Sequence, residues 1–133
     1  MARWLLPLVL LALLPATAAA AADNPLAGTT WRVTRVQGEI VKRSAGERLA
    51  FRSREFTGHA TCGNDFGGRY RATATRLRFS QIVTTGAGCD GGRPVPPDIA
   101  GVVARVRGYR ITGRKLELLG RRGRTLAVLK RQA

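Results

Sequence analysis

The sequence has few of the side chains from which catalytic and metal sites are built. It contains one histidine, two cysteines and eight acidic residues among its 133 positions. A structural zinc site takes four Cys or His ligands, and the whole chain has three such residues. Its acids are scattered, without the spacing of a calcium loop or the clustering expected of a glycosidase pair. We therefore expect no metal, no cofactor and no glycoside-cleaving site.

The sequence also lacks an apolar run long enough to cross a membrane. The run Leu5–Leu14 has about ten residues, whereas a spanning helix needs roughly 20. Arg3 precedes it, and the small residues 15–22 follow it with several A-x-A matches. This order is typical of a secretory signal peptide, so we expect residues 1–22 to be cleaved and residues 23–133 to form one domain. No cysteine follows the run to carry a lipid, which predicts a periplasmic or secreted protein that is not integral to the membrane.

Only two cysteines are present, Cys62 and Cys89. In an oxidising compartment their default state is a disulfide, which would close a loop of about 28 residues and stabilise the fold by roughly 3–4 kcal/mol. The alternative is a Cys-dependent enzyme with His59 as the base of Cys62. Side chains three apart in a strand point to opposite faces, and the thiolate would have to stay unpaired. We therefore predict no catalytic residue and a non-enzymatic protein.

Negative charge is scarce as well, because 23 Lys and Arg residues face eight acids and give a formal net charge of +15. A strong positive field attracts anions, and an exported chain meets phosphorylated lipids more often than nucleic acid. This favours an anionic envelope lipid or cell-wall polymer as partner, bound by a monomer. The candidate residues are Arg105, Arg107, Arg110, Arg114, Arg121, Arg122 and Arg124. The other interpretation is a solvated surface shaped by a GC-rich genome, since arginine outnumbers lysine twenty to three.

Short segments in which apolar and polar residues alternate make up most of the remaining chain. "TTWRVTRV", "RLAF", "EFTGHATC", "RLRFSQIV", "YRI", "KLELL" and "TLAVL" each predict a strand with one wet face, and the phase slips before Val36. Turn residues such as "TGRK" and "GRRGR" stand between them. Asn64, Gly67 and Gly68 accept positive φ or a close backbone approach, and around Phe66 they predict a tight strand connection. We expect the core to include Trp31, Phe51, Phe56, Phe66, Tyr70 and Phe79.

One segment has a helical period instead. Ile99, Val102, Val103 and Val106 recur at i, i+3, i+4 and i+7, which predicts one short α-helix near residues 97–107. Asp98 suits its N-terminal end, and Gly108 suits its C-terminal stop.

Four stretches carry a family resemblance: "LAGTTWRV" at 26–33, "FTGHATCGNDFGGRY" at 56–70, "VTTGAGC" at 83–89 and "VARVRGYRITGRKLELL" at 103–119. Together they resemble the META domain, the HslJ-like family of small bacterial envelope proteins. The residues that match the family pattern are Trp31, Gly58, Asn64, Phe66, Gly68, Tyr70, Thr85 and Tyr109. The chain departs from it at Gly63, which separates Cys62 from Asn64, and at Ala87–Gly88 before Cys89.

The resemblance implies a mainly β fold, a small antiparallel β-barrel of lipocalin-like topology with one helix. It also implies no established catalytic activity and no cofactor. Members of the family are associated with envelope stress and heat-shock responses. We therefore expect an exported META-domain protein that serves as a stress-related or binding module, with an Arg-rich module for anionic lipid or polymer as the alternative.

Overall fold

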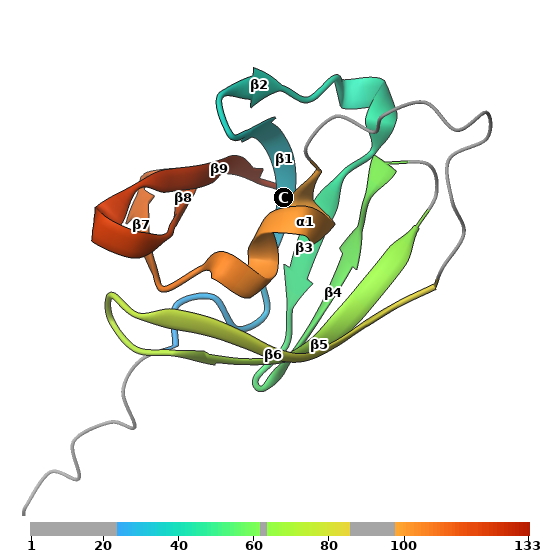
Figure 1. Cartoon of the computed structure of the whole chain (residues 1–133). Coiled ribbons are helices and arrows are strands. Elements are labelled where there is room, and N and C mark those ends of the chain that lie inside the picture. Colours follow the sequence, from blue (N-terminus) through green and yellow to red (C-terminus); the bar gives the residue numbers. More distant parts are fainter. Residues whose placement is uncertain (1–23, 62–63, 86–97) are drawn as a thin grey trace, which may run out of the picture.

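The computed structural model describes residues 24–61, 64–85 and 98–133 (Figure 1). The predicted signal peptide, Cys62, Gly63, Pro97 and Cys89 lie outside these residues. The described strands are β1 (Thr30–Val36), β2 (Glu39–Ile40), β3 (Arg48–Phe51), β4 (Glu55–His59), β5 (Asp65–Ala72), β6 (Leu77–Thr84), β7 (Gly108–Thr112), β8 (Lys115–Leu119) and β9 (Thr125–Arg131). The helical segments are η1 (Arg43–Ala45), α1 (Ile99–Val102), η3 (Val103–Arg105) and η4 (Arg121–Gly123).

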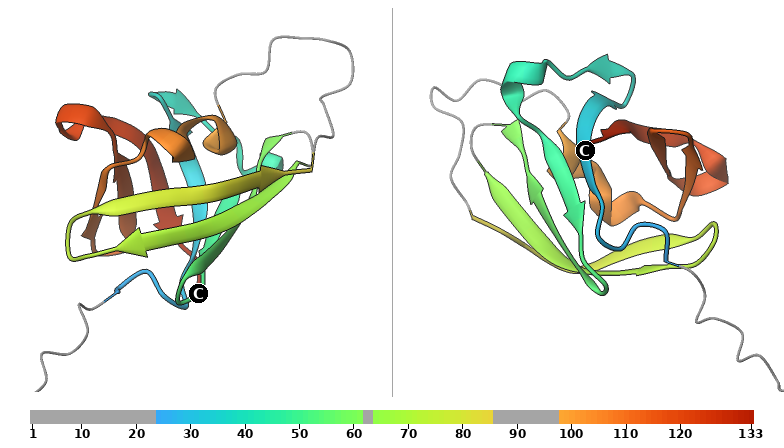
Figure 2. Two further views of the ribbon diagram at one scale, coloured as in Figure 1. Left: turned by 60° about the horizontal axis from the view of Figure 1, so that its bottom comes forward. Right: turned by 180° about the vertical axis from the view of Figure 1, so that it is seen from behind.

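The strands form one antiparallel sheet in the order β6-β5-β4-β3-β1-β9-β8-β7, with β2 paired beside β1. The sheet curls into a half-barrel, so that its two edge strands approach each other (Figure 2). They meet at one end, where Arg76 and Gly108 form a bridge and the Tyr109 amide donates to the Thr75 carbonyl at 3.0 Å. This architecture confirms the predicted mainly β, barrel-like fold with one short helix.

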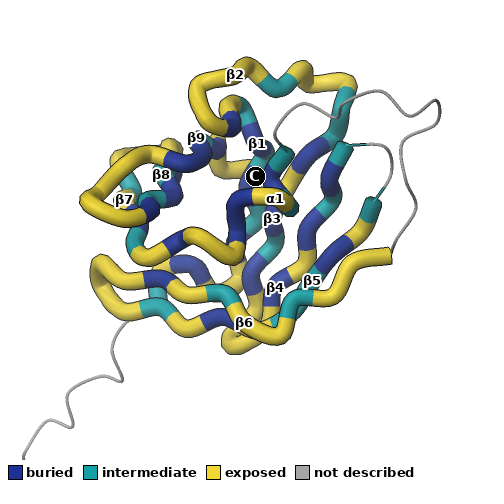
Figure 3. Tube along the Cα trace, viewed as in Figure 1, coloured by how far each residue is buried: buried dark blue, intermediate teal, exposed yellow. Residues whose placement is uncertain are grey.

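Buried and exposed residues alternate along the strands (Figure 3). This is the pattern of strands whose apolar side chains point into the curl and whose polar side chains point out. The predicted aromatic core is present: Trp31, Phe51, Phe56, Phe66 and Tyr70 are buried, and Phe79 packs against them partly buried. Burying each large apolar side chain contributes about 1.5–3 kcal/mol. The predicted phase slip before Val36 is a register shift between Val33 and Arg35.

The close backbone approach expected at Gly67 and Gly68 is present, but both residues lie in a strand, which corrects the predicted tight connection. Both glycines lie inside β5, where they permit neighbouring strands to approach closely. A Cβ on Gly67 would stand 2.9 Å from the Phe56 carbonyl oxygen, and one on Gly68 would stand 2.6 Å from that of Ser80. The glycines therefore relieve crowding between paired strands, and the register of β5 against β6 shifts at this point.

The helical segment lies across the open side of the half-barrel (Figure 1). The Asp98 carboxylate accepts from the Gly101 amide at 3.0 Å and caps α1, as its sequence position predicts. Ile99, Val102, Val103 and Val106 are all buried, which confirms the apolar face.

Gly108 does not stop the helix. It is the first residue of β7, where a Cβ would meet the Thr75 carbonyl at 2.9 Å, so its role is the close approach of the two sheet edges. Across the described ranges 24–61, 64–85 and 98–133, no helix is long and apolar enough to cross a membrane.

Candidate anion-binding site

Five arginines from two separate segments line one open depression of about 1040 Å³. Arg105 ends η3, Arg107 precedes β7, and the other three come from the turn between β8 and β9. The lining residues are Arg105, Arg107, Gly120, Arg121, Arg122, Arg124 and Leu126. All five arginines are exposed, and the lining includes no carboxylate. We refer to this site as the five-arginine depression.

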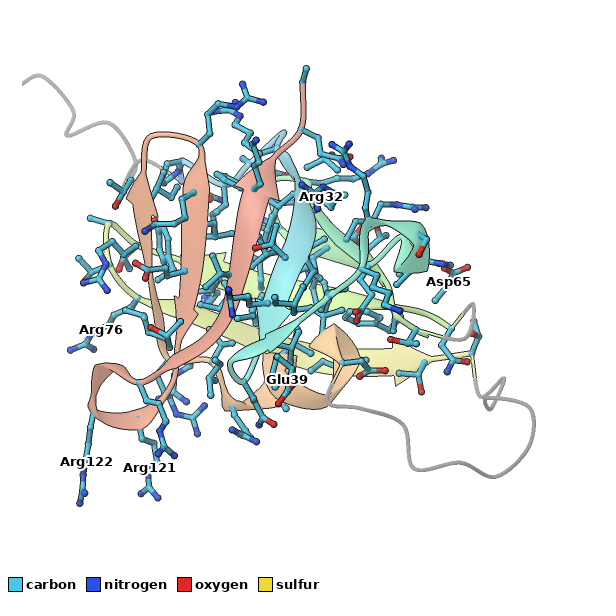
Figure 4. All side chains as sticks on the ribbon, turned by 90° about the horizontal axis from the view of Figure 1, so that it is seen from above. Arg32, Glu39, Asp65, Arg76, Arg121 and Arg122 are labelled. Atoms are coloured by element: carbon cyan, nitrogen blue, oxygen red, sulfur yellow. The ribbon has the colours of Figure 1, made fainter. Side chains whose placement is uncertain are left out.

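Backbone hydrogen bonds hold the turn that carries three of these arginines. The Gly120 amide donates to the Arg124 carbonyl at 2.7 Å, and the Gly123 amide donates to the Gly120 carbonyl at 3.2 Å. Arg122 and Gly123 both adopt positive φ, 57° and 70°, so the chain reverses within a few residues. The side chains of Arg121 and Arg122 consequently project away from the barrel wall (Figure 4).

Arg105 and Arg107 are positioned from the other side of the depression. Gln37, with its amide oxygen facing the guanidinium, accepts from the two terminal nitrogens of Arg105 at 3.0 and 2.9 Å. The backbone amide of Gln37 donates to the Leu126 carbonyl at 2.8 Å, and this hydrogen bond connects the β1–β2 turn to β9. The Arg107 guanidinium donates to the Val106 carbonyl at 3.3 Å. The sequence analysis did not single out Gln37, although the dipeptide Gln37–Gly38 indicates a turn between two strands.

The chemistry of the depression favours an anion. Guanidinium groups stay protonated, and their planar forks match phosphate and carboxylate oxygens. The ion pairs within the described residues are His59–Asp65 and Arg110–Glu117, so neither neutralises this cluster. Five like charges brought together raise the local positive potential, and an anion bound there would offset their repulsion.

Two of the seven predicted arginines lie elsewhere. Arg110 Nε donates to Glu117 Oε2 at 2.7 Å, and this hydrogen bond lowers the pKa of the Glu117 carboxyl. Arg114, in the β7–β8 turn, donates to the Arg131 carbonyl at 2.8 Å and lines a different depression. The structure therefore gathers five of the seven into one site.

A second group of polar residues surrounds His59. His59 Nδ1 lies 2.8 Å from Asp65 Oδ1, because the two residues stand directly opposite each other on β4 and β5. Sequence analysis missed this pair, although both residues flank the same short turn. Glu47 is buried nearby, and its carboxylate accepts from the Ile99 amide at 3.0 Å. Burial raises the pKa of the Glu47 carboxyl, and the negative charge of Asp98 adds to the effect.

The described part of the chain holds no group of three or more His, Cys, Asp or Glu side chains placed to bind a metal ion.

The motif residues make packing and turn contacts. Trp31, Gly58, Phe66, Tyr70 and Tyr109 are buried. The Trp31 indole donates to Thr29 Oγ1 at 2.7 Å, the Tyr70 hydroxyl donates to the Arg52 carbonyl, and the Tyr109 hydroxyl donates to the Thr73 carbonyl. The indole and the two hydroxyls thus each have a partner within the fold. The buried Oδ1 of Asn64 has no such partner among the described residues.

The remaining motif residues lie at the β4–β5 turn and beside it. The Asn64 carbonyl accepts from the Ala60 amide at 2.8 Å, and Thr85 Oγ1 accepts from the Asp65 amide at 3.1 Å. With Gly68 inside β5, these residues shape the sheet, so we assign the motif a structural role.

Comparison with known proteins agrees with this fold. The family model of the META domain matches residues 24–133. The chain belongs to the META domain family. A solved structure, described as the NMR structure of the protein from Burkholderia xenovorans, shares 17% sequence identity with a TM-score of 0.57, and the match covers 81% of this chain and 84% of that one. At this identity the likeness shows the fold alone. No curated protein matches the chain.

Proposed function

We propose that this META-domain protein is an exported, non-enzymatic module that binds anionic phospholipid of the cell envelope through the five-arginine depression. The observation that carries the proposal is the gathering of five guanidinium groups from two separate segments around one open surface without a carboxylate. The projecting side chains of Arg121 and Arg122 could enter a headgroup layer while the barrel stays outside it (Figure 4). Export, and hence contact with envelope lipids, is supported by the basic, apolar and small-residue order of residues 1–22.

The test is co-sedimentation of the exported protein with vesicles that contain an anionic phospholipid, against vesicles of zwitterionic lipid alone. We expect binding to the anionic vesicles at about 0.01 M salt and release at about 1 M, because salt screens exposed charges. Each surface arginine contributes about 1 kcal/mol near an anionic membrane, so changing Arg107, Arg121 and Arg124 together to Gln should weaken binding roughly a hundredfold.

A matched control loses the same charge elsewhere. Changing Arg54, Arg71 and Arg78 together to Gln also removes three exposed cations, none of which lines the depression. This control should weaken vesicle binding much less. Equal losses in the two variants, binding that ignores salt, or no binding at low salt would each contradict the proposal.

The contact between His59 and Asp65 favours the alternative, a Cys-dependent enzyme. A carboxylate that orients an imidazole is the third member such a site needs, and Cys62 is three residues from His59 in the sequence. The non-enzymatic proposal is supported by the default pairing of two cysteines in an exported chain. Counting free thiols, described in the Discussion, separates these two functions.

A further inference from the structure

The outer face of the sheet carries a row of like charges that no single strand reveals. In the pairing register, Arg48 of β3 stands opposite Arg32 of β1, and Arg32 stands opposite Lys130 of β9. Lys130 in turn stands opposite Lys115 of β8. Four adjacent strands therefore contribute one cationic residue each. We call Arg48, Arg32, Lys130 and Lys115 the cation row.

The four side chains point to the same side of the sheet. Each follows or precedes a buried residue in its own strand, such as Leu49, Trp31, Leu129 or Leu116. Since successive side chains alternate between faces, the row lies on the outer face. Neighbouring strands are about 4.8 Å apart, so the row extends about 15 Å across the barrel wall.

This arrangement is unfavourable without a partner, because like charges directly opposite each other destabilise a strand pair. No member of the row takes part in the contacts His59–Asp65 and Arg110–Glu117 found in the described residues, and the Glu117 carboxylate interacts electrostatically with Lys115 alone among the four. Further cations lie beside it: Arg43, Arg114 and Arg131 join Arg32 and Lys130 around a depression of about 430 Å³. The Arg131 guanidinium lies 6.0 Å from the centroid of the Trp31 ring.

The cation row is separate from the five-arginine depression. Arg124 stands just before β9 begins, whereas Lys130 lies near the end of that strand. Seven strand residues span about 20 Å. In Figure 4, Arg32 and the pair Arg121 and Arg122 accordingly lie at opposite ends of the sheet. The two sites share no residue.

We propose that the cation row binds a flexible linear polyanion, a polymer whose phosphate or carboxylate groups repeat at short intervals. A small anion reaches only neighbouring members of the row, whereas an extended chain placed across the strands meets all four. The row follows the convex wall of a curled sheet, so a flexible polymer can follow it and a flat bilayer touches only part of it. Within the described residues no aromatic side chain is exposed, which leaves no platform for stacking nucleic-acid bases.

The first test uses the unaltered exported protein and inorganic polyphosphate of graded length, with polygalacturonate as the carboxylate polymer. Affinity should rise with chain length until a chain spans the row, and inorganic phosphate alone should bind weakly. Binding of either polymer supports the proposal and identifies the preferred anionic group. Binding of neither, or an affinity that does not depend on length, overturns it.

The second test changes Arg48, Lys115 and Lys130 together to Gln and keeps the half-buried Arg32. We expect polymer affinity to fall more than tenfold at low salt. Each lost contact on a flexible polyanion lowers the slope of log affinity against log salt by about 0.7, so three contacts lower it by about 2. The triple variant of Arg54, Arg71 and Arg78 is the matched control. It should keep most of the polymer affinity and most of the salt dependence.

The remaining outcomes are equally decisive. The variant of Arg107, Arg121 and Arg124 should retain polymer binding while it loses vesicle binding, so failure of the lipid proposal and failure of this one are distinguishable. Equal losses in the row variant and its control would show that only net charge matters. If the row variant loses vesicle binding as strongly as polymer binding, the row is a membrane surface and the proposal is wrong. Removing like charges should leave the fold intact, and far-ultraviolet circular dichroism checks this.

Discussion

Glu47 is a carboxylate that the fold buries to close the N-terminal end of a short helix. Its side chain accepts from the Ile99 amide, while Asp98 accepts from the Gly101 amide two residues further on. Burial raises the pKa of Glu47 above its ordinary value of 4.5, since a charge loses solvation inside the protein. The hydrogen bond from Ile99 opposes this effect only in part.

The raised pKa predicts a pH-dependent stability. The folded state holds the Glu47 proton more tightly than the unfolded chain, so its contribution is fully present below pH 4.5 and declines as the pH rises through the raised value. Changing Glu47 to Gln should remove this decline and leave the protein at least as stable at neutral pH. Urea denaturation across the pH range measures the difference from the unaltered protein.

One further variant of Glu47 and a control at another glutamate complete this test. Changing Glu47 to Ala should cost about 1–3 kcal/mol, because the Ile99 amide loses its partner in a buried place. Changing the exposed Glu39 to Gln is the control and should leave the pH profile unchanged. A profile that is the same with and without the Glu47 carboxyl would contradict the assignment.

Paired strands β4 and β5 show why a glycine stands inside a strand. Gly58 faces Phe66 directly in the register, and a Cβ on Gly58 would lie 2.2 Å from the nearest atom of that ring. The Phe66 ring therefore covers the backbone of the opposite strand and packs edge-on against Phe56, with ring centroids 6.0 Å apart. The family motif therefore has glycine at position 58 because the Phe66 ring fills the space that a Cβ would need.

Changing Gly58 to Ala should destabilise the fold by about 1–3 kcal/mol, because the added methyl group overpacks the core. Combining it with Phe66→Leu should cost less than the sum of the two single changes, since the shorter side chain relieves the clash. Chemical denaturation of all three variants checks this. Thr57→Ala, at the adjacent exposed position, should change stability by less than about 0.5 kcal/mol. Additive effects of Gly58 and Phe66 would show that the two residues do not compete for space.

At the scale of the whole molecule, the half-barrel is held by its own side chains and by the meeting of β6 and β7 at one end. Exposed basic residues are frequent on its outer surface and form two separate cationic sites, the five-arginine depression and the cation row. With a net charge of +15 the molecule repels itself as well as attracting anions, so bound anions would also stabilise it.

The proposed export also predicts the redox state of the whole chain. The denatured exported protein should show no free thiol before reduction and two after it, because Cys62 and Cys89 would pair in an oxidising compartment. Replacing both cysteines with Ser should then lower stability by roughly 3–4 kcal/mol. A quantitative thiol assay measures the first result. Two free thiols, with Cys62 reacting rapidly at neutral pH, would favour the Cys-dependent enzyme instead, and His59 would be the next residue to change.

The sequence alone determined most of the strands, the aromatic core and where the short helix lies. These properties depend on local alternation and spacing, as with the buried Trp31 and Phe51 or the face of Ile99 and Val102. It assigned Gly67 and Gly68 to a tight connection where the structure has strand β5, because a glycine that starts a turn and one that relieves crowding between strands look the same in a sequence.

Only the tertiary structure decided which distant residues meet. Arg105 and Arg124 share a depression, and Arg32 stands between Arg48 and Lys130, because strand order and register bring them together. Register depends on turn lengths and on shifts such as the one between Val33 and Arg35. A shift of one residue would turn a strand's outward side chains inward, so the position of a charge along the chain does not predict its neighbours.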